Sequence, residues 1–193
     1  EYENFPKFLD WANEQSLIKG FRRVLHVVPD EISQTKLFRN NVKRLSETKL
    51  TFDLCVSSRQ LPLTYELVDY CPEVTFVLDH CGVPDIQSND FHDWAPKILE
   101  LSKRNNVYCK ISGIIAYGNP VFWTLDELRP YFEHAISSFG HDRIVWGSDS
   151  PVCNLGGNLE TWVAITHILT SDWSKSDRAA LFSKNAFHLW DLV

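Results

Sequence analysis

The sequence predicts an α/β fold, a (β/α)₈ TIM barrel to which this chain contributes about strands four to eight. Three observations lead to this prediction. Short apolar stretches alternate with stretches of helical periodicity along all 193 residues, as in repeated βα units. The apolar stretches lack polar alternation, which is typical of parallel strands covered on both faces. The turn at 29–31 is Pro-Asp-Glu, without the glycines of an open dinucleotide-binding sheet.

Composition narrows the class of protein. We expect a single domain over residues 1–193, the C-terminal portion of a barrel, because five βα units cannot close one and three more would precede Glu1. The formal net charge of −6 argues against nucleic acid as a partner. No apolar run approaches the roughly 18 residues that span a membrane. Five cysteines without a CxxC pair are typical of buried, reduced thiols, which predicts a cytoplasmic protein.

Strands and helices are predicted in alternation. The predicted strands are the short apolar stretches 20–28, 50–56, 74–79, 107–111 and 143–147. The predicted helices, in which apolar residues recur every three or four positions, are 4–15, 33–47, 61–70, 91–103, 124–139, 159–169 and 175–189. Each strand is followed by a helix, so right-handed crossovers should make the strands parallel.

Capping signals mark the ends of two helices. Ser33 is a suitable N-cap for the helix over 33–47. Thr124 and Glu127 form a capping-box sequence, in which each side chain bonds to the other residue's backbone N–H. Gly140 can end that helix in a left-handed conformation. The helix over 124–139 is therefore the best-bounded element of the prediction.

Polar residues stand at or near the carboxyl ends of the predicted strands, where the βα loops of a barrel surround one shared site. In chain order, these residues are Arg22, His26, Ser57, Ser58, Arg59, His80, Lys110, Ser112 and Asp149. We expect the site to lie at this mouth of the barrel. The predicted substrate contacts are Arg22, His26, Arg59, Lys110 and Trp146.

Asp149 and His80 are the strongest candidates for chemistry. Asp149 follows the apolar run 144–146 and the break at Gly147. His80 follows the apolar run 75–78. One strand end that offers an imidazole and another that offers a carboxylate predict a metal-assisted or acid–base hydrolase. Both residues are thus expected to act in catalysis and to hold a metal.

Each candidate also has a purely structural interpretation. Asp149 stands in the sequence Ser-Asp-Ser-Pro, which is good turn chemistry. His80 fits a core histidine bonded to a backbone carbonyl. Arg22 fits an ion pair with Asp53 or Asp79 inside the barrel, because an unpaired buried charge is costly. These interpretations remain open at the level of the sequence.

Five motifs occur in order along the chain, and together they point to a family. They are Gly20-Phe21-Arg22-Arg23, Phe52-Asp53-Leu54, Leu78-Asp79-His80-Cys81-Gly82, Lys110-Ile111-Ser112-Gly113 and Trp146-Gly147-Ser148-Asp149-Ser150-Pro151. The combination resembles the amidohydrolase-related (amidohydrolase 2) metal-dependent hydrolases of TIM-barrel fold. Within that group it is most similar to sugar-lactone hydrolases, such as L-fuconolactone and L-rhamnonolactone hydrolases. The likeness covers nearly the whole chain.

The resemblance implies roles for the two candidates. Asp149 matches the strand-eight aspartate, which holds a metal or its water and acts as general base. His80 matches the strand-six histidine, a metal ligand or a polariser of the substrate carbonyl. The implied cofactor is a divalent metal, with zinc favoured, although the HxH pair of strand one is absent from the sequence. Residues 56–59 stand where many relatives place a further histidine ligand.

Three functions follow from these observations. The first is a hydrolase that opens a small lactone or similar cyclic ester with an activated water. The second is a metal-dependent decarboxylase of the same superfamily, which would release carbon dioxide from an acid. The third is a non-catalytic truncated barrel that pairs with another chain through its open sheet edges. A small-molecule substrate is expected in the first two, and a homo-oligomer is left open.

Overall fold

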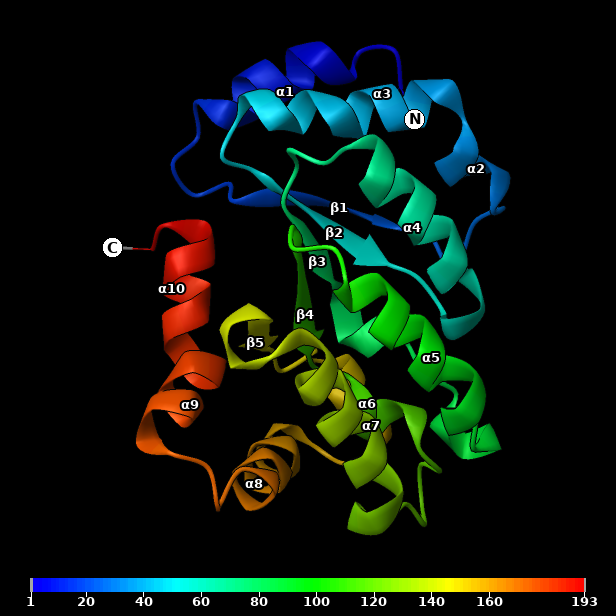
Figure 1. Ribbon diagram of the computed structural model, residues 1–193, viewed down its shortest axis with the longest axis vertical. Coiled ribbons are helices and arrows are strands. Elements are labelled where there is room, and N and C mark those ends of the chain that lie inside the picture. Colours follow the sequence, from blue (N-terminus) through cyan, green and yellow to red (C-terminus); the bar gives the residue numbers. More distant parts are fainter. Residues whose placement is uncertain (1, 193) are drawn as a thin grey trace.

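The computed structural model describes residues 2–192 and contains a parallel sheet of five strands. In chain order these are β1 (Gly20–Val24), β2 (Thr51–Cys55), β3 (Phe76–Leu78), β4 (Val107–Ile111) and β5 (Ile144–Trp146). Strands that follow each other in the chain are neighbours in the sheet, all in parallel register (Figure 1). This order is that of a TIM barrel, whereas a doubly wound sheet reverses its strand order part-way. The predicted α/β class with a parallel sheet is confirmed.

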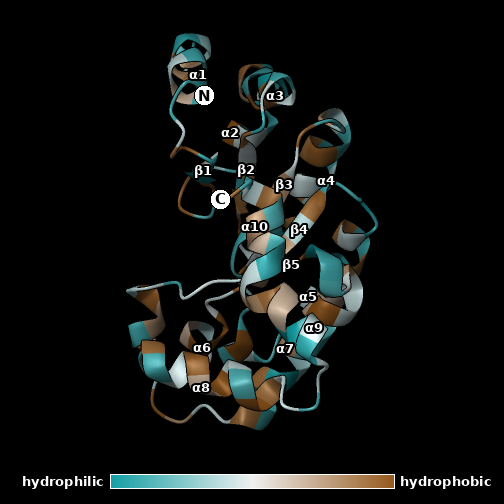
Figure 2. Ribbon diagram, turned by 90° about the vertical axis from the view of Figure 1, so that its left-hand side faces the viewer, coloured by the Kyte–Doolittle hydropathy of each residue, from teal (hydrophilic) through white to brown (hydrophobic). Residues whose placement is uncertain are grey.

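Helices connect the strands. Their bounds are α1 (Phe5–Asn13), α2 (Glu31–Gln34), α3 (Lys36–Lys43), α4 (Leu61–Tyr70), α5 (Phe91–Ser102), α6 (Ile114–Tyr117), α7 (Leu125–Phe139), α8 (Leu159–Leu169), α9 (Lys175–Ala179) and α10 (Asn185–Trp190). Figure 1 shows α3, α4 and α5 along one side of the sheet, with α10 apart from them on the other side. In Figure 2 the helices are brown on some faces and teal on others, as amphipathic helices between core and water should be. Within residues 2–192, no helix has the length and apolar character needed to cross a membrane.

Two predicted helices are interrupted. The helix expected over 33–47 breaks at Thr35, which is extended with ψ 144°. The Thr35 hydroxyl accepts a hydrogen bond from the backbone N–H of Phe38 at 3.2 Å and so starts α3 as an N-cap. The helix expected over 175–189 contains a π-helical turn at Ala180–Lys184. The capping box that opens α7 is present as predicted, with Thr124 and Glu127 bonded to each other's backbone.

Four of the five strands are shorter than predicted, whereas β4 has the predicted bounds, and the difference matters for the site. β1 ends at Val24 rather than at residue 28, so His26 lies in the following loop. β3 consists only of Phe76–Leu78, because the chain turns at Asp79. His80 therefore lies in a turn that follows β3 and not on the strand itself.

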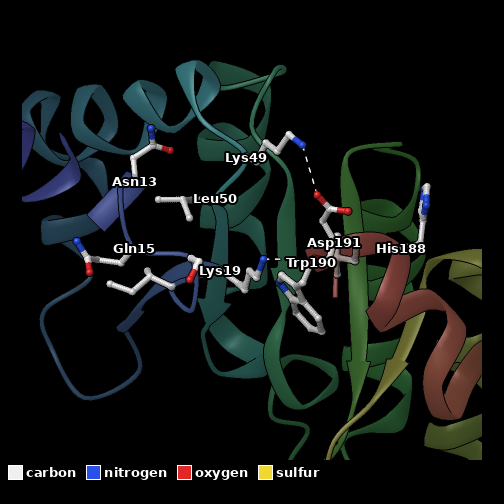
Figure 3. A pocket seen from close by; sticks show the side chains of 11 residues that line it. Asn13, Gln15, Lys19, Lys49, Leu50, His188, Trp190 and Asp191 are labelled. Carbon is white, nitrogen blue, oxygen red and sulfur yellow. Dashed lines mark hydrogen bonds and ion pairs between the residues drawn. The ribbon is translucent and has the colours of Figure 1, made fainter. Parts of the chain in front are cut away.

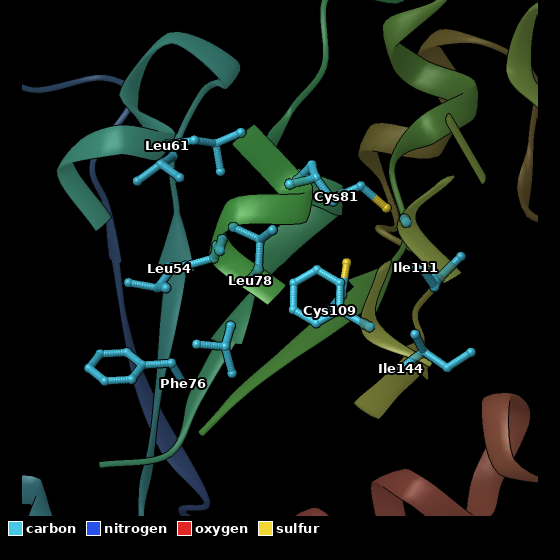
Figure 4. Close-up of a cluster of buried hydrophobic side chains, with 14 of the residues drawn as sticks. Leu54, Leu61, Phe76, Leu78, Cys81, Cys109, Ile111 and Ile144 are labelled. Atoms are coloured by element: carbon cyan, nitrogen blue, oxygen red, sulfur yellow. The ribbon is translucent and has the colours of Figure 1, made fainter. Parts of the chain in front are cut away.

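A single hydrophobic core holds the strands. The side chains of Leu54, Phe76, Leu78, Cys109 and Ile144 are buried and lie together in Figure 4. They pack against apolar residues from the covering helices, including the fully buried rings Trp94, Phe132 and Trp162. Interiors of this kind are close-packed and hardly deform. The carboxyl ends of the strands are thereby held in fixed positions relative to one another.

Candidate active site

His80 lies in a strained turn directly after β3. His80, Cys81 and Val83 have φ values of 53°, 52° and 45°, in the left-handed region that β-branched and bulky residues rarely adopt. The indole Nε1 of Trp94 donates to the carbonyl oxygen of Cys81 at 2.8 Å. The Val83 N–H donates to the carbonyl oxygen of His80 at 2.9 Å. Strain of this kind persists only where the surroundings enforce it, and it concentrates at functional sites.

Asp149 lies in the loop after β5 and faces this turn. Its φ is 53°, again left-handed, and its carbonyl oxygen accepts from the N–H of Cys153 at 2.9 Å. The side chain is only 10% exposed, and its Oδ2 lies 3.4 Å from Nδ1 of His80. Among the residues that the structure describes, no donor forms a hydrogen bond with this buried oxygen. A buried carboxylate oxygen without a partner is costly, and such a group calls for a ligand or a functional explanation.

Ser112 completes the arrangement around His80. Its hydroxyl lies 2.8 Å from Nδ1 of His80, and both residues are buried. Ser112 follows β4, so three neighbouring strand ends contribute one side chain each. The sequence placed Ser112 among the polar residues of the strand ends but gave it no role. The structure makes it the hydrogen-bond partner of the imidazole.

Burial sets the protonation of the pair. It lowers the pKa of His80 to about 4, against the opposing effect of Asp79. It also raises the pKa of Asp149 to about 6, helped by the negative charge of Asp79. At neutral pH His80 is therefore uncharged and Asp149 is mostly ionised, so their contact is not an ion pair. A carboxylate whose pKa lies this close to neutrality is suited to general-base work.

Gly113 provides the space that the pair occupies. Its φ of +73° is left-handed, and a Cβ at this position would lie 2.8 Å from Oδ2 of Asp149. The same Cβ would lie 2.9 Å from the ring of Tyr117 and 3.1 Å from Cβ of His80. Any larger residue would push these groups apart. Three side chains thus converge on the backbone of one glycine.

An ionic cluster lies beneath the pair. Nζ of Lys110 lies 2.7 Å from Oδ2 of Asp53 and also bonds to Asp79, whose side chain is fully buried. Nη1 of Arg22 approaches Oδ2 of Asp79 at 3.5 Å, so the ion pair anticipated for Arg22 is present. Burial lowers the pKa of Lys110, but Asp53 and Asp79 outweigh it and raise the pKa overall. Lys110 is therefore charged and engaged by the two carboxylates.

Arg59 and Trp146 are engaged away from the pair, whereas His26 lies near it, because the Cys55 sulfur that it contacts is within 4.8 Å of a ring nitrogen of His80. Nδ1 of His26 lies 3.6 Å from Sγ of Cys55, and the His26 ring is exposed. Both terminal nitrogens of Arg59 bind Asp30, at 2.6 and 3.1 Å. The indole N–H of Trp146 donates to the hydroxyl of Thr166 in α8 at 3.1 Å, so this ring packs toward a helix. Their roles in substrate binding remain predictions.

Tyr117 and Cys55 lie at the site but are not among the residues predicted for it. Tyr117 ends α6, a one-turn helix too short to show periodicity, and its ring approaches Asp149 across Gly113. Burial raises the pKa of the Tyr117 phenol, with a further contribution from Asp149, so it stays protonated. Cys55 ends β2 and is a buried, free thiol, as expected for the cysteines of this sequence. Tyr117 lies near Asp149, and Cys55 lies near Asp79 and His80.

The donor set is compatible with a divalent metal. Cys55, Asp79 and His80 each offer a ligand atom, and these atoms lie within 4.8 Å of one another. Asp79 already binds Lys110 and Arg22, whereas the buried Oδ2 of Asp149 has no hydrogen-bond partner among residues 2–192. Neutral imidazole, carboxylate and thiolate are the ligand types of zinc sites. Cys55, Asp79 and His80 are thus the residues whose ligand atoms converge, and Asp149, 3.4 Å from His80, offers a further carboxylate, while burial raises the pKa of the Cys55 thiol to about 11.

A second pocket lies at the opposite ends of the strands (Figure 3). It is lined by residues that precede β1 and β2 and by the end of α10, among them Lys19, Lys49, Trp190 and Asp191. Nζ of Lys49 pairs with the Asp191 carboxylate at 3.4 Å, and Nζ of Lys19 donates to the Asp191 carbonyl at 3.3 Å. The amino ends of barrel strands serve stability rather than catalysis. These contacts fasten α10 to the sheet.

Comparison with known proteins identifies relatives. An uncharacterized protein, y4mH of Sinorhizobium fredii, is 36% identical over 96% of this chain and 66% of its own length. An L-fucono-1,5-lactonase of Burkholderia ambifaria is 32% identical over 73% of this chain and 50% of its own length. This chain thus spans about half to two thirds of the length of these relatives.

Structural comparison and the family model agree with these relatives. A crystal structure of an amidohydrolase from Burkholderia multivorans, with bound zinc, matches with a TM-score of 0.92 and 25% sequence identity. The match covers 100% of this chain and 72% of that one. The model of the family described as Amidohydrolase matches residues 3–192, which confirms the resemblance seen in the motifs. The chain belongs to this amidohydrolase family.

Proposed function

We propose that the protein hydrolyses a small lactone at the carboxyl ends of its strands, with Asp149 as the general base and His80 as its partner. The proposal includes a single-domain TIM barrel in which this chain supplies strands four to eight. The observation that carries it is the Asp149 carboxylate, buried without a hydrogen-bond partner among the described residues and 3.4 Å from a neutral His80. The relatives named as lactonases support the choice of substrate class.

The chemistry needs a base and a donor. Asp149 takes a proton from a water molecule, whose oxygen attacks the lactone carbonyl and forms a tetrahedral oxyanion. If the hydroxyl of Ser112 donates to Nδ1 of His80, then Nε2 carries the ring proton and can donate to the developing oxyanion. Collapse of the oxyanion breaks the ring C–O bond. The leaving alkoxide takes the proton back from Asp149, which yields a hydroxy acid and restores the base.

The ionic cluster of Lys110, Arg22 and Asp79 balances the negative charge next to His80. Lys110 and Arg22 neutralise Asp79, which precedes His80 in the chain. The Arg22 side chain is half exposed, so its guanidinium remains available as the predicted contact to a substrate oxygen. Where a divalent ion is bound, His80 and Asp149 would hold it, and it would supply Lewis acidity for the carbonyl and a more acidic water.

Substitution of the pair tests the proposal. Hydrolysis of L-fucono-1,5-lactone can be followed in a pH-indicator assay. We expect Asp149→Asn to lower kcat/KM by about a hundredfold or more and His80→Ala by at least about tenfold, as for the loss of a positioned acid–base group. Asp142→Asn and His92→Ala are matched controls, because both side chains are exposed and lie elsewhere. Full activity in Asp149→Asn, with unchanged thermal unfolding, would remove Asp149 from the mechanism.

A carbon dioxide assay separates the decarboxylase hypothesis. The lactone reaction releases a proton and no gas, whereas decarboxylation of an acid releases carbon dioxide. Carbon dioxide from an aromatic acid, together with no opening of any lactone, would contradict the proposed hydrolysis. Carbon dioxide release that persists in Asp149→Asn would also show that a different group acts as the base.

A further inference from the structure

A cleft lies beside the His80–Asp149 pair, at the same ends of the strands. Its volume is about 510 Å³. Its walls come from the segments after four strands, namely Ser57 after β2, Val83 and Pro84 after β3, Tyr117 from α6 after β4, and Leu155 after β5. It is therefore built by the loops that also carry the catalytic pair. Nothing in the proposed mechanism uses this space.

Tyr117 connects the cleft to the catalytic pair. The Tyr117 ring and the Asp149 carboxylate approach the same point above Gly113, at 2.9 and 2.8 Å from it. The ring and the carboxylate are thus close neighbours, and Tyr117 also lines the cleft. Tyr117 is therefore the residue that adjoins Asp149 and the cleft at once.

The loop after β5 is fixed against α6. A Cβ at Gly156 would overlap the carbonyl oxygen of Ile115, so the two backbones are in direct contact. The indole N–H of Trp123 donates to the carbonyl oxygen of Gly156 and holds the same loop. Leu155 is consequently kept beside Ala116, although its side chain is 64% exposed. The cleft is a built feature of the fold rather than a gap between loose loops.

The walls of the cleft are mostly apolar, with Ser57 and Gln87 as uncharged polar residues among them. Most of the lining side chains are aliphatic, aromatic or proline. The one charged residue is Asp85, whose carboxylate accepts from the N–H of Ser88 at 3.2 Å. No lysine, arginine or histidine is among the lining residues in the described part of the chain. Apolar surface favours apolar groups, and an uncompensated carboxylate would be repelled by Asp85.

We propose that this cleft binds an uncharged, apolar substituent on the lactone ring, and that Leu155 and Tyr117 thereby determine which lactones are hydrolysed. The substrate class is a neutral lactone with an alkyl substituent, as opposed to a lactone that carries a second carboxylate. This inference rests on the proposed lactone hydrolysis. It adds a binding site for the part of the substrate that does not react.

Three δ-lactones test the cleft by kinetics. They are δ-valerolactone, δ-octalactone, which carries a propyl group on the ring, and an analogue with a carboxyethyl group in place of the propyl. We expect kcat/KM for δ-octalactone to exceed that for δ-valerolactone by about tenfold or more, from the methylenes removed from water. The carboxyethyl analogue should be the poorest of the three. Leu155→Asp should reduce the preference for δ-octalactone to about threefold or less, since it places a charge in the wall.

A control variant and the pattern of activities distinguish failure of the cleft proposal from failure of the hydrolase proposal. Leu17→Asp places the same charge on a side chain that is 93% exposed and precedes β1, at the other end of the strands, and it should keep the preference. If the three lactones are hydrolysed equally well, or Leu155→Asp leaves their ratio unchanged, the cleft proposal is wrong while the hydrolase proposal stands. If L-fucono-1,5-lactone is hydrolysed but none of the three is, the cleft proposal is wrong, and if none of the four is hydrolysed, the hydrolase proposal is wrong.

A binding measurement then judges the cleft by itself. Saturation-transfer NMR with a propyl-substituted cyclohexanone, which cannot be hydrolysed, reports which part of the ligand contacts the protein. Propyl signals that are strong in the wild type and in Leu17→Asp but weak in Leu155→Asp support the cleft. Equal propyl signals in all three proteins overturn it.

Discussion

Replacement of Lys110 by methionine tests how the ionic cluster contributes to stability. The Lys110 side chain is 18% exposed and lies between Asp53, 17% exposed, and Asp79, which is fully buried. Methionine preserves most of the volume but leaves two neighbouring carboxylates without their shared cation. Removing one partner of a buried ion pair costs about 3–5 kcal/mol, because the remaining charge stays desolvated. Arg22 still approaches Asp79 at 3.5 Å, so we expect a loss of about 3 kcal/mol.

The pH dependence of this loss gives a second, independent check. Lys110 lowers the pKa of Asp53 in the wild type, so without the ammonium group that pKa in the folded protein should rise further above the unfolded value of about 3.9. A raised carboxyl pKa destabilises the folded state above that folded pKa, and the penalty disappears as the pH falls through it. The gap between Lys110→Met and wild type should therefore be full at pH 8 and shrink toward pH 5. Burial already raises the pKa of Asp53 in the wild type, which points the same way.

Urea unfolding monitored by circular dichroism measures both quantities. Lys103→Met is the matched control, because Lys103 pairs with Glu100 on the surface and its side chain is 64% exposed. Exposed pairs contribute about 0–1 kcal/mol, so the control should unfold close to wild type. Equal unfolding free energies for Lys110→Met and Lys103→Met would refute the argument. A gap that widens on acidification would refute it as well.

Three further predictions address the site and the scaffold. Gly113→Ala should lower hydrolysis by at least about tenfold, because its Cβ would lie 2.8 Å from Oδ2 of Asp149 and small displacements at a reacting centre are costly. Gly140→Ala is the control, since Gly140 shares a positive φ (+74°) but a Cβ there would have no atom within 4 Å. Equal activity in the two variants would contradict the steric argument. In chelator-treated protein, log(kcat/KM) should rise with pH and level off above about pH 6, because Asp149 must be ionised and burial raises its pKa to about 6; a rate that levels off near pH 4 would exclude Asp149 as the base. Thr124→Ala should cost about 1 kcal/mol of unfolding free energy, because it removes the N-cap of α7, and Thr48→Ala, outside a helix start, provides the comparison by urea unfolding.

The two residues placed first from the sequence are those that the structure brings together. Asp149 and His80 each follow a short apolar strand, and in a parallel sheet the carboxyl ends of all strands lie at one edge. That rule alone predicts that they are near neighbours, and their side chains lie 3.4 Å apart. The rule works here because β3, β4 and β5 are adjacent in the sheet. The rule predicts the edge of the sheet at which the two side chains lie, but it does not predict the distance between them.

Other candidates show where the rule stops. Arg59 lies near the same edge, yet a bidentate contact with Asp30 holds its guanidinium. Trp146 is on β5, yet its indole packs toward Thr166 and Phe182. Both outcomes depend on partners far along the chain, which local patterns do not contain. The position at a strand end therefore predicts candidate site residues, and tertiary contacts determine which of them lie at the site.

The sequence by itself determined the α/β class, the parallel strands and the motifs of the amidohydrolase family. Periodicity, capping residues and strand composition act over a few residues, so they can be read locally. Only the tertiary structure decided the protonation of His80 and Asp149, because their pKa values follow from burial by segments remote in the chain. It alone revealed Ser112 against His80, and Tyr117 beside Asp149 and in the wall of the apolar cleft. Distances between loops are fixed by packing of the whole core, and no stretch of sequence contains that information.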